Sequence, residues 1–112
     1  LKTTADANPE TFARTALTYG YEQQMAHYRD VMEAETGTRP RFLFVLVEKT
    51  DPYLVSVEEL DELFYDLGRQ KNVEAAARWK HAVDTNEWPG YQGINRVLAP
   101  MWALDELEEE IY

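Results

Sequence analysis

The sequence contains no cysteine, which excludes disulfides, zinc–thiolate sites and cysteine nucleophiles. It has no apolar run near the ~18 residues that a membrane-spanning helix needs, and no basic-then-apolar start typical of a secretory signal. No Ser-His-Asp arrangement, phosphate-binding glycine loop or H-E-x-x-H motif is present. These absences fit a protein of the reducing cytoplasm with no membrane partner.

Basic residues are also scarce, with 11 Lys and Arg against 21 Asp and Glu and a net charge of −10. Taken alone, this balance argues against a nucleic-acid binder, because phosphate contacts need positive charge. The placement of charge governs binding more than its total does. Much of the acidic excess lies in residues 105–112, which we predict to be a solvated acidic tail.

What is present favours a packed globule. The chain has 112 residues, 45% hydrophobic content and three tryptophans, enough for one core. We therefore predict a single domain over residues 1–112.

The first half of the sequence predicts a strand end followed by one long helix. Residues 1–4 have the β-branched character of a strand end, and Asn8 and Pro9 supply a helix cap and first position. Apolar residues then recur at helical spacing to Glu35, and Gly37 provides a stop. Gly20 inside this helix, which would be about 40 Å long at ~1.5 Å per residue, suggests close approach of another backbone.

The second half predicts a hairpin and a second long helix. Residues 42–47 are apolar on both faces, as in a strand covered on two sides, and a turn at Pro52 leads into an alternating strand over 53–57. Ser56-x-x-Glu59 is a candidate capping box for a helix that runs to about Asp84, with a kink at Gly68. Residues 101–112 predict a short final helix. The fold class is α/β (α+β), in the order strand end, long helix, β-hairpin, long helix, tail.

Three residues stand out as candidates for chemistry. Gln24 and Tyr28 lie one turn apart on the apolar stripe of the first helix, and Lys2 ends the first strand. Taken singly, Gln24 is more often a core amide bonded to a neighbouring backbone, Tyr28 a core aromatic and Lys2 a solvated charge. A lysine at a strand end beside metal-bound carboxylates offsets charge in a phosphoryl-transfer transition state.

Set in order, these segments resemble the C-terminal part of the exonuclease VIII-like (RecE-type) branch of the PD-(D/E)XK nuclease superfamily, over roughly residues 1 to 91. The matching pieces are Lys2-Thr3-Thr4, Gln24-x-x-x-Tyr28, the strand 42–47 leading into Glu48-Lys49, Pro52-Tyr53-x-Val55, and Trp88-Pro89-Gly90-Tyr91. The resemblance implies a partial restriction-endonuclease-like core, a mixed sheet flanked by helices. It also implies a Mg²⁺-dependent (or Mn²⁺-dependent) exonuclease that acts on double-stranded DNA ends in recombination or phage DNA processing.

By the same resemblance, Lys2 is the lysine of the D/E-x-K motif, and Gln24 and Tyr28 support the active site and contact DNA, all three facing one pocket. The acids that bind the metal are expected before Leu1, so these 112 residues alone are predicted to bind no metal specifically and to be inactive. The rival interpretation is a non-catalytic acidic interaction or assembly module derived from a nuclease fold. A homo-oligomer is compatible with both.

Overall fold

The computed structural model describes residues 1–111, and the side chains up to residue 109. Within residues 1–111, four helices and one three-stranded sheet confirm the α+β class. Tyr112, the last residue of the predicted acidic tail, lies outside the described residues. In chain order the elements are β1 (Lys2–Thr4), α1 (Pro9–Tyr19), α2 (Tyr21–Thr36), β2 (Phe44–Glu48), β3 (Val55–Glu58), α3 (Glu62–Thr85) and α4 (Met101–Ile111).

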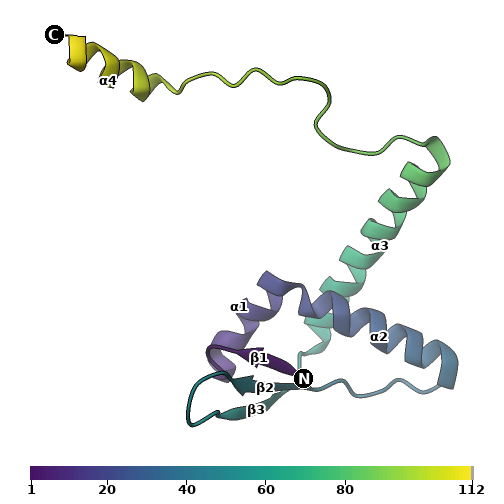
Figure 1. Cartoon of the computed structure of the whole chain (residues 1–112). Helices are drawn as coiled ribbons and strands as arrows, with labels where there is room; N and C mark the ends of the chain where they lie inside the picture. The colour runs from purple at the N-terminus through teal and green to yellow at the C-terminus, as the bar shows by residue number, and fades with distance from the viewer. Residues whose placement is uncertain (112) are drawn as a thin grey trace.

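The sheet has the order β1-β2-β3, with β2 in the centre (Figure 1). β1 pairs parallel to β2, with Lys2 opposite Leu46, and α1 and α2 form the crossover between these strands. β3 pairs antiparallel to β2, with Val47 opposite Val55, which confirms the predicted hairpin. Because paired residues share a face of the sheet, Lys2 lies on the same side as Leu46.

The prediction of one continuous first helix was wrong, because Gly20 interrupts the helix and separates α1 from α2. This residue has φ of 70° and ψ of 30°, and its N–H donates to the carbonyl of Ala16 at the end of α1. Its own carbonyl accepts from the N–H groups of Gln23 and Gln24, so the same glycine starts α2. Left-handed backbone costs other residues about 1–2 kcal/mol, and glycine adopts it freely. Gly20 therefore serves to turn the chain and gives no close approach to another backbone.

The predicted kink in the second long helix was also wrong, since α3 runs unbroken through Gly68. Its cap is Asp61, whose carboxylate accepts from the N–H of Phe64 at 3.0 Å. The predicted capping residue, Ser56, lies instead in β3, where its hydroxyl donates to Glu58. β3 continues to Glu58 and α3 begins only at Glu62, so the helix starts later than the capping-box pattern indicated.

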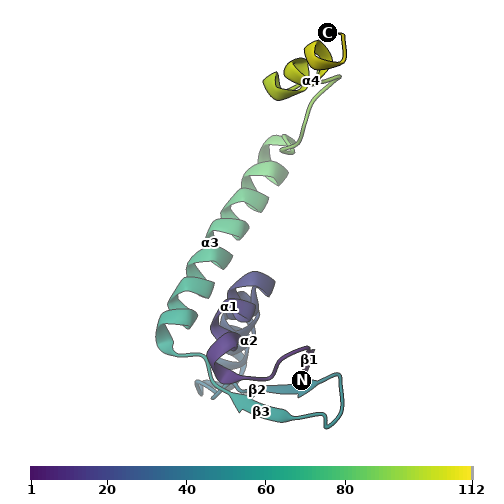
Figure 2. The same cartoon turned by 90° about the vertical axis from the view of Figure 1, so that its left-hand side faces the viewer.

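The core lies on one side of the sheet, between the strands and the helices α1, α2 and α3 (Figure 2). The opposite face carries valines from β2 and β3, and Val55 and Val57 are each 60% exposed. The expectation that the central strand is covered on both faces was therefore wrong for the residues described. The buried cluster consists of Ala7, Phe12, Ala16, Met25, Ala26, Phe44, Leu46, Leu60 and Tyr65.

The C-terminal part of the chain extends away from this core. Figures 1 and 2 show α3 projecting beyond the sheet and α4 far from it. The radius of gyration is 22.2 Å, well above the ~13 Å expected of a compact chain of this length. Residues 105–111 lie within α4. Within residues 1–111, none of the helices has the length and apolar character required to cross a bilayer.

Candidate functional site

Lys2 lines a pocket of about 480 Å³ between β1, the end of β2 and α1. Its ammonium lies over the ring of Tyr21, 4.6 Å from the centroid, which is a cation–π contact. The parallel pairing with Leu46 points the Lys2 side chain toward the helical layer, where Tyr21 begins α2. The strand register and the break at Gly20 thus bring lysine and tyrosine together.

A row of aromatic rings extends from Tyr21 along the seam between α2 and β2. Tyr21 stacks on Phe44 at 5.6 Å, Phe44 contacts Phe42 at 5.1 Å, and Phe42 stacks on Tyr28 at 6.2 Å between centroids. The two tyrosines at its ends lie on one face of α2, and the two phenylalanines between them come from the start of β2 and the segment before it. The row links the Lys2 end of α2 with the Tyr28 end.

Gln24 shares the face of α2 that carries Tyr21 and Tyr28, at helical spacings of three and four residues. Tyr28 is half exposed and lies about 10 Å along the helix from Tyr21, at ~1.5 Å per residue. Within the described residues, the lining of the Lys2 pocket includes Tyr21 but neither Gln24 nor Tyr28. The structure thus groups the amide and the phenol on one helical face, and their convergence with Lys2 in one pocket stays a prediction.

A second lysine, Lys49, lines the same pocket from the far end of β2, and its backbone N–H donates to the carbonyl of Thr4 at 3.0 Å. Thr11 and Thr15 contribute hydroxyls from α1. The acid of this lining is Asp6, whose carboxylate accepts from the N–H of Asn8 and the hydroxyl of Thr11. The pocket therefore combines two cations and several hydroxyls with one carboxylate that already holds the entry to α1.

The described residues do not fit the metal that the resemblance implies. Mg²⁺ needs oxygen ligands in near-octahedral geometry, usually including one or two carboxylates. Among residues 1–109, no group of three or more His, Asp or Glu side chains lies close enough to hold an ion. Near Lys2, Asp6 is engaged as above, and Glu48 accepts from the N–H of Ala7 at 3.3 Å. We therefore assign no metal chemistry to these side chains.

One turn of α3 holds the start of α2 in place. Gly68 packs directly on the backbone of Glu22: a Cβ there would lie 2.1 Å from the Glu22 carbonyl oxygen. Lys71 Nζ donates to Glu22 Oε1 at 2.7 Å, and Asn72 Nδ2 donates to the carbonyl of Gln23 at 3.0 Å. Glu22 is fully buried, and its second oxygen has no partner among the described residues. These contacts orient the helix that presents Tyr21 and Gln24.

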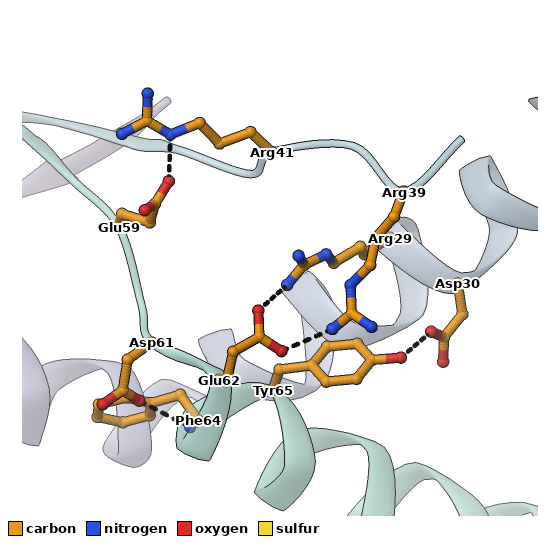
Figure 3. Close-up of polar contacts among 9 residues, drawn as sticks. All are labelled: Arg29, Asp30, Arg39, Arg41, Glu59, Asp61, Glu62, Phe64 and Tyr65. Carbon is orange, nitrogen blue, oxygen red and sulfur yellow. Dashed lines mark hydrogen bonds and ion pairs between the residues drawn. The ribbon is translucent and has the colours of Figure 1, made fainter.

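An arginine cluster at the other end of α2 is neutralised by acids (Figure 3). Glu62 accepts from Arg29 at 3.1 Å and from Arg39 at 2.6 Å, and Arg41 pairs with Glu59. Because each guanidinium has a carboxylate partner, we interpret this cluster as a clamp that ties the segment before β2 to α2 and to the start of α3.

Tyr65 completes the clamp, with the guanidiniums of Arg29 and Arg39 over its ring at 5.2 and 4.5 Å. Its hydroxyl donates to Asp30, as Figure 3 shows. This hydrogen bond, followed by burial of the ring, raises the pKa of Tyr65 above its ordinary value of 10.0. The neutral phenol is therefore the form that the fold stabilises.

Sequence reasoning did not identify several residues that shape this region. Tyr21 lies three residues before Gln24 on the same apolar stripe, so its helical face could be predicted. Nothing in the sequence marked it as the contact of Lys2. From the sequence, Lys49 was interpreted as a charged residue that follows the end of a strand, without a binding role. The partnership of Glu22 with Lys71 spans 49 positions, a separation at which no local pattern gives a signal.

Comparison with known families gives one identification. Residues 1–98 match the family profile described as a PDDEXK-like domain of unknown function, DUF3799. A search of curated proteins finds none that matches the chain. The matched region covers most of the chain, including β1, α1, α2, the hairpin and α3. The chain therefore belongs to this PDDEXK-like family, and through it to the PD-(D/E)XK superfamily.

Proposed function

We propose that the intact protein is a metal-dependent exodeoxyribonuclease of the exonuclease VIII-like (RecE-type) branch, acting on double-stranded DNA ends in recombination or phage DNA processing in the cytoplasm. Its cofactor would be Mg²⁺ or Mn²⁺. The observation that supports the proposal most is Lys2. By the resemblance it is the lysine of the D/E-x-K motif, and its ammonium lines a pocket without a carboxylate partner among the described residues.

In this proposal Lys2 stabilises negative charge that builds up on the phosphoryl oxygens as the phosphodiester bond breaks. A fixed cation at a partly enclosed site is suited to this role, because it needs little reorganisation during the reaction. Tyr21 beneath the ammonium limits its positions. Gln24 and Tyr28 would position the DNA strand from the same helical face, Tyr28 through its half-exposed ring and hydroxyl.

The test compares the intact protein with its Lys2→Ala variant on linear duplex DNA with Mg²⁺ or Mn²⁺. Loss of one charge-stabilising group typically costs about 10²–10³-fold in rate, so we expect a reduction of that order. Lys80→Ala is the matched control, because Lys80 is an exposed lysine of α3 that pairs with Asp84 away from the pocket. Its rate should equal that of the wild type, and both variants should retain the wild-type circular dichroism spectrum.

Two outcomes would contradict the proposal. Absence of cleavage by the wild type with either metal removes the nuclease assignment, and an undiminished rate in Lys2→Ala removes the role of the lysine. A polypeptide of these 112 residues alone is expected to be inactive, because its described side chains provide no metal-binding group.

The second candidate function is a non-catalytic assembly module. One observation favours it: the part of the chain beyond the core exposes many large apolar side chains, and such surfaces mark protein contacts. They include Val73, Trp79, Val83, Ile94, Val97, Leu98 and Trp102. The cleavage assay separates the two candidates, since an assembly module leaves linear DNA intact under both metals.

A further inference from the structure

Within the described residues, the Lys2 pocket brings together two lysines that form no ion pair. The chain has 11 Lys and Arg among almost twice as many acids, so carboxylate partners are plentiful. Six of these cations form ion pairs. Five cations form no ion pair among the described residues, and two of these five, Lys2 and Lys49, line one pocket. The other three are Arg14, Arg78 and Arg96. Two unpaired lysines in one cavity of a strongly acidic protein indicate that the pocket takes its negative charge from outside.

The walls of the pocket match this interpretation. Tyr19 carries a hydroxyl, a group that donates hydrogen bonds to phosphate oxygens. The hydroxyls of Thr11 and Thr15 also line the pocket, but they already donate within the protein. The Asp6 carboxylate is held by the N–H of Asn8 and the hydroxyl of Thr11, so it stays with the chain entering α1. The arginine cluster at the other end of α2 offers no such site, because each of its guanidiniums is already paired.

We propose that Lys49 is a second phosphate-binding residue, which holds a phosphodiester of the DNA strand next to the phosphate at Lys2. The inference rests on the proposed function for its ligand, and it adds a residue to which no role has been assigned. The side chain of Lys49 is exposed at the end of β2, whereas Lys2 is half-buried on Tyr21. We therefore expect Lys49 to contribute to DNA affinity and Lys2 to the chemical step.

The experiment measures binding of a fluorescent duplex by anisotropy in EDTA, over a range of salt concentrations, with the intact protein and its Lys49→Gln variant. Each lost phosphate contact reduces the slope of log K against log salt by about 0.9. We expect Lys49→Gln to reduce the slope by about that amount and to weaken binding roughly fivefold to tenfold at moderate salt. Lys80→Gln, the matched exposed lysine on α3, should leave both quantities unchanged.

The outcomes separate this inference from the proposed function. If the protein cleaves DNA but Lys49→Gln matches Lys80→Gln in affinity and slope, the inference is wrong and the nuclease assignment stands. Weaker binding and a reduced slope in a protein that never cleaves DNA would support the phosphate site and contradict the nuclease. Absence of DNA binding by the wild type would overturn the inference. In the nuclease, Lys49→Gln should raise KM and leave kcat near the wild-type value, in contrast to Lys2→Ala.

Discussion

Gly68 gives the sharpest test of the fold, because local propensity and tertiary packing predict opposite signs for the same substitution. In a helix interior, replacing glycine with alanine normally stabilises by about 1 kcal/mol. Here the added Cβ would lie 2.1 Å from the carbonyl oxygen of Glu22 and 2.5 Å from its carbonyl carbon. This is about 1 Å inside an ordinary C···O contact of ~3.3 Å.

Relief of this overlap requires α3 to move away from α2, because the obstacle is backbone. Overpacking of this kind typically costs about 1–3 kcal/mol. The same movement strains the hydrogen bonds from Lys71 to Glu22 and from Asn72 to Gln23, each worth about 1 kcal/mol. After the gain in helix propensity is subtracted, we expect Gly68→Ala to lower the free energy of unfolding by about 2–3 kcal/mol.

Urea denaturation of the intact protein, followed by circular dichroism, measures this change as a lower midpoint at an unchanged slope. Gly90→Ala is the control, because a Cβ at Gly90 meets nothing within 4 Å, and the expected change is within ~0.5 kcal/mol. A Gly68→Ala variant as stable as the wild type would show that α3 does not pack on the backbone of α2, and would remove the contact between Gly68 and Glu22 from our account of the site.

Two further predictions concern the contacts around α2. Lys71→Met leaves the buried Glu22 carboxylate without its partner, and it should lower the free energy of unfolding by roughly 2 kcal/mol, less than the ~3–5 kcal/mol of a fully buried pair because Lys71 is 39% exposed. In urea denaturation, adding Glu22→Gln to this variant should recover part of the loss. Additive losses in the double variant would contradict the pairing. The raised pKa of Tyr65 means that its stabilisation is complete below the unfolded value of about 10 and is lost as pH rises through the folded value. Tyr65→Phe should therefore flatten the fall in stability above about pH 10, measured by urea denaturation over a pH series. Equal slopes in both proteins would refute the hydrogen bond to Asp30 as the cause.

The sequence alone predicted the local elements well, because their signals are local. Asn8 and Pro9 start α1, Gly37 ends α2, and α3 ends one residue beyond the predicted Asp84. Caps, periodicity and alternation act over a few residues, so they can be identified without knowledge of the partners. The resemblance that identified the superfamily depended on these elements occurring in order, and the match over residues 1–98 confirms it at that level.

Tertiary structure decided what the sequence left ambiguous, and the two helical glycines show why. Both Gly20 and Gly68 carry the same intrinsic cost in a helix, so propensity cannot say which breaks its helix and which remains within it. Gly20 turns the chain because left-handed backbone lets α2 lie along the sheet, and Gly68 stays helical because the backbone of Glu22 occupies the space of its missing side chain. The same holds for Lys2 and Lys49, which meet in one pocket only because β1 pairs in parallel with β2, where Lys2 lies opposite a residue 44 positions later in the chain.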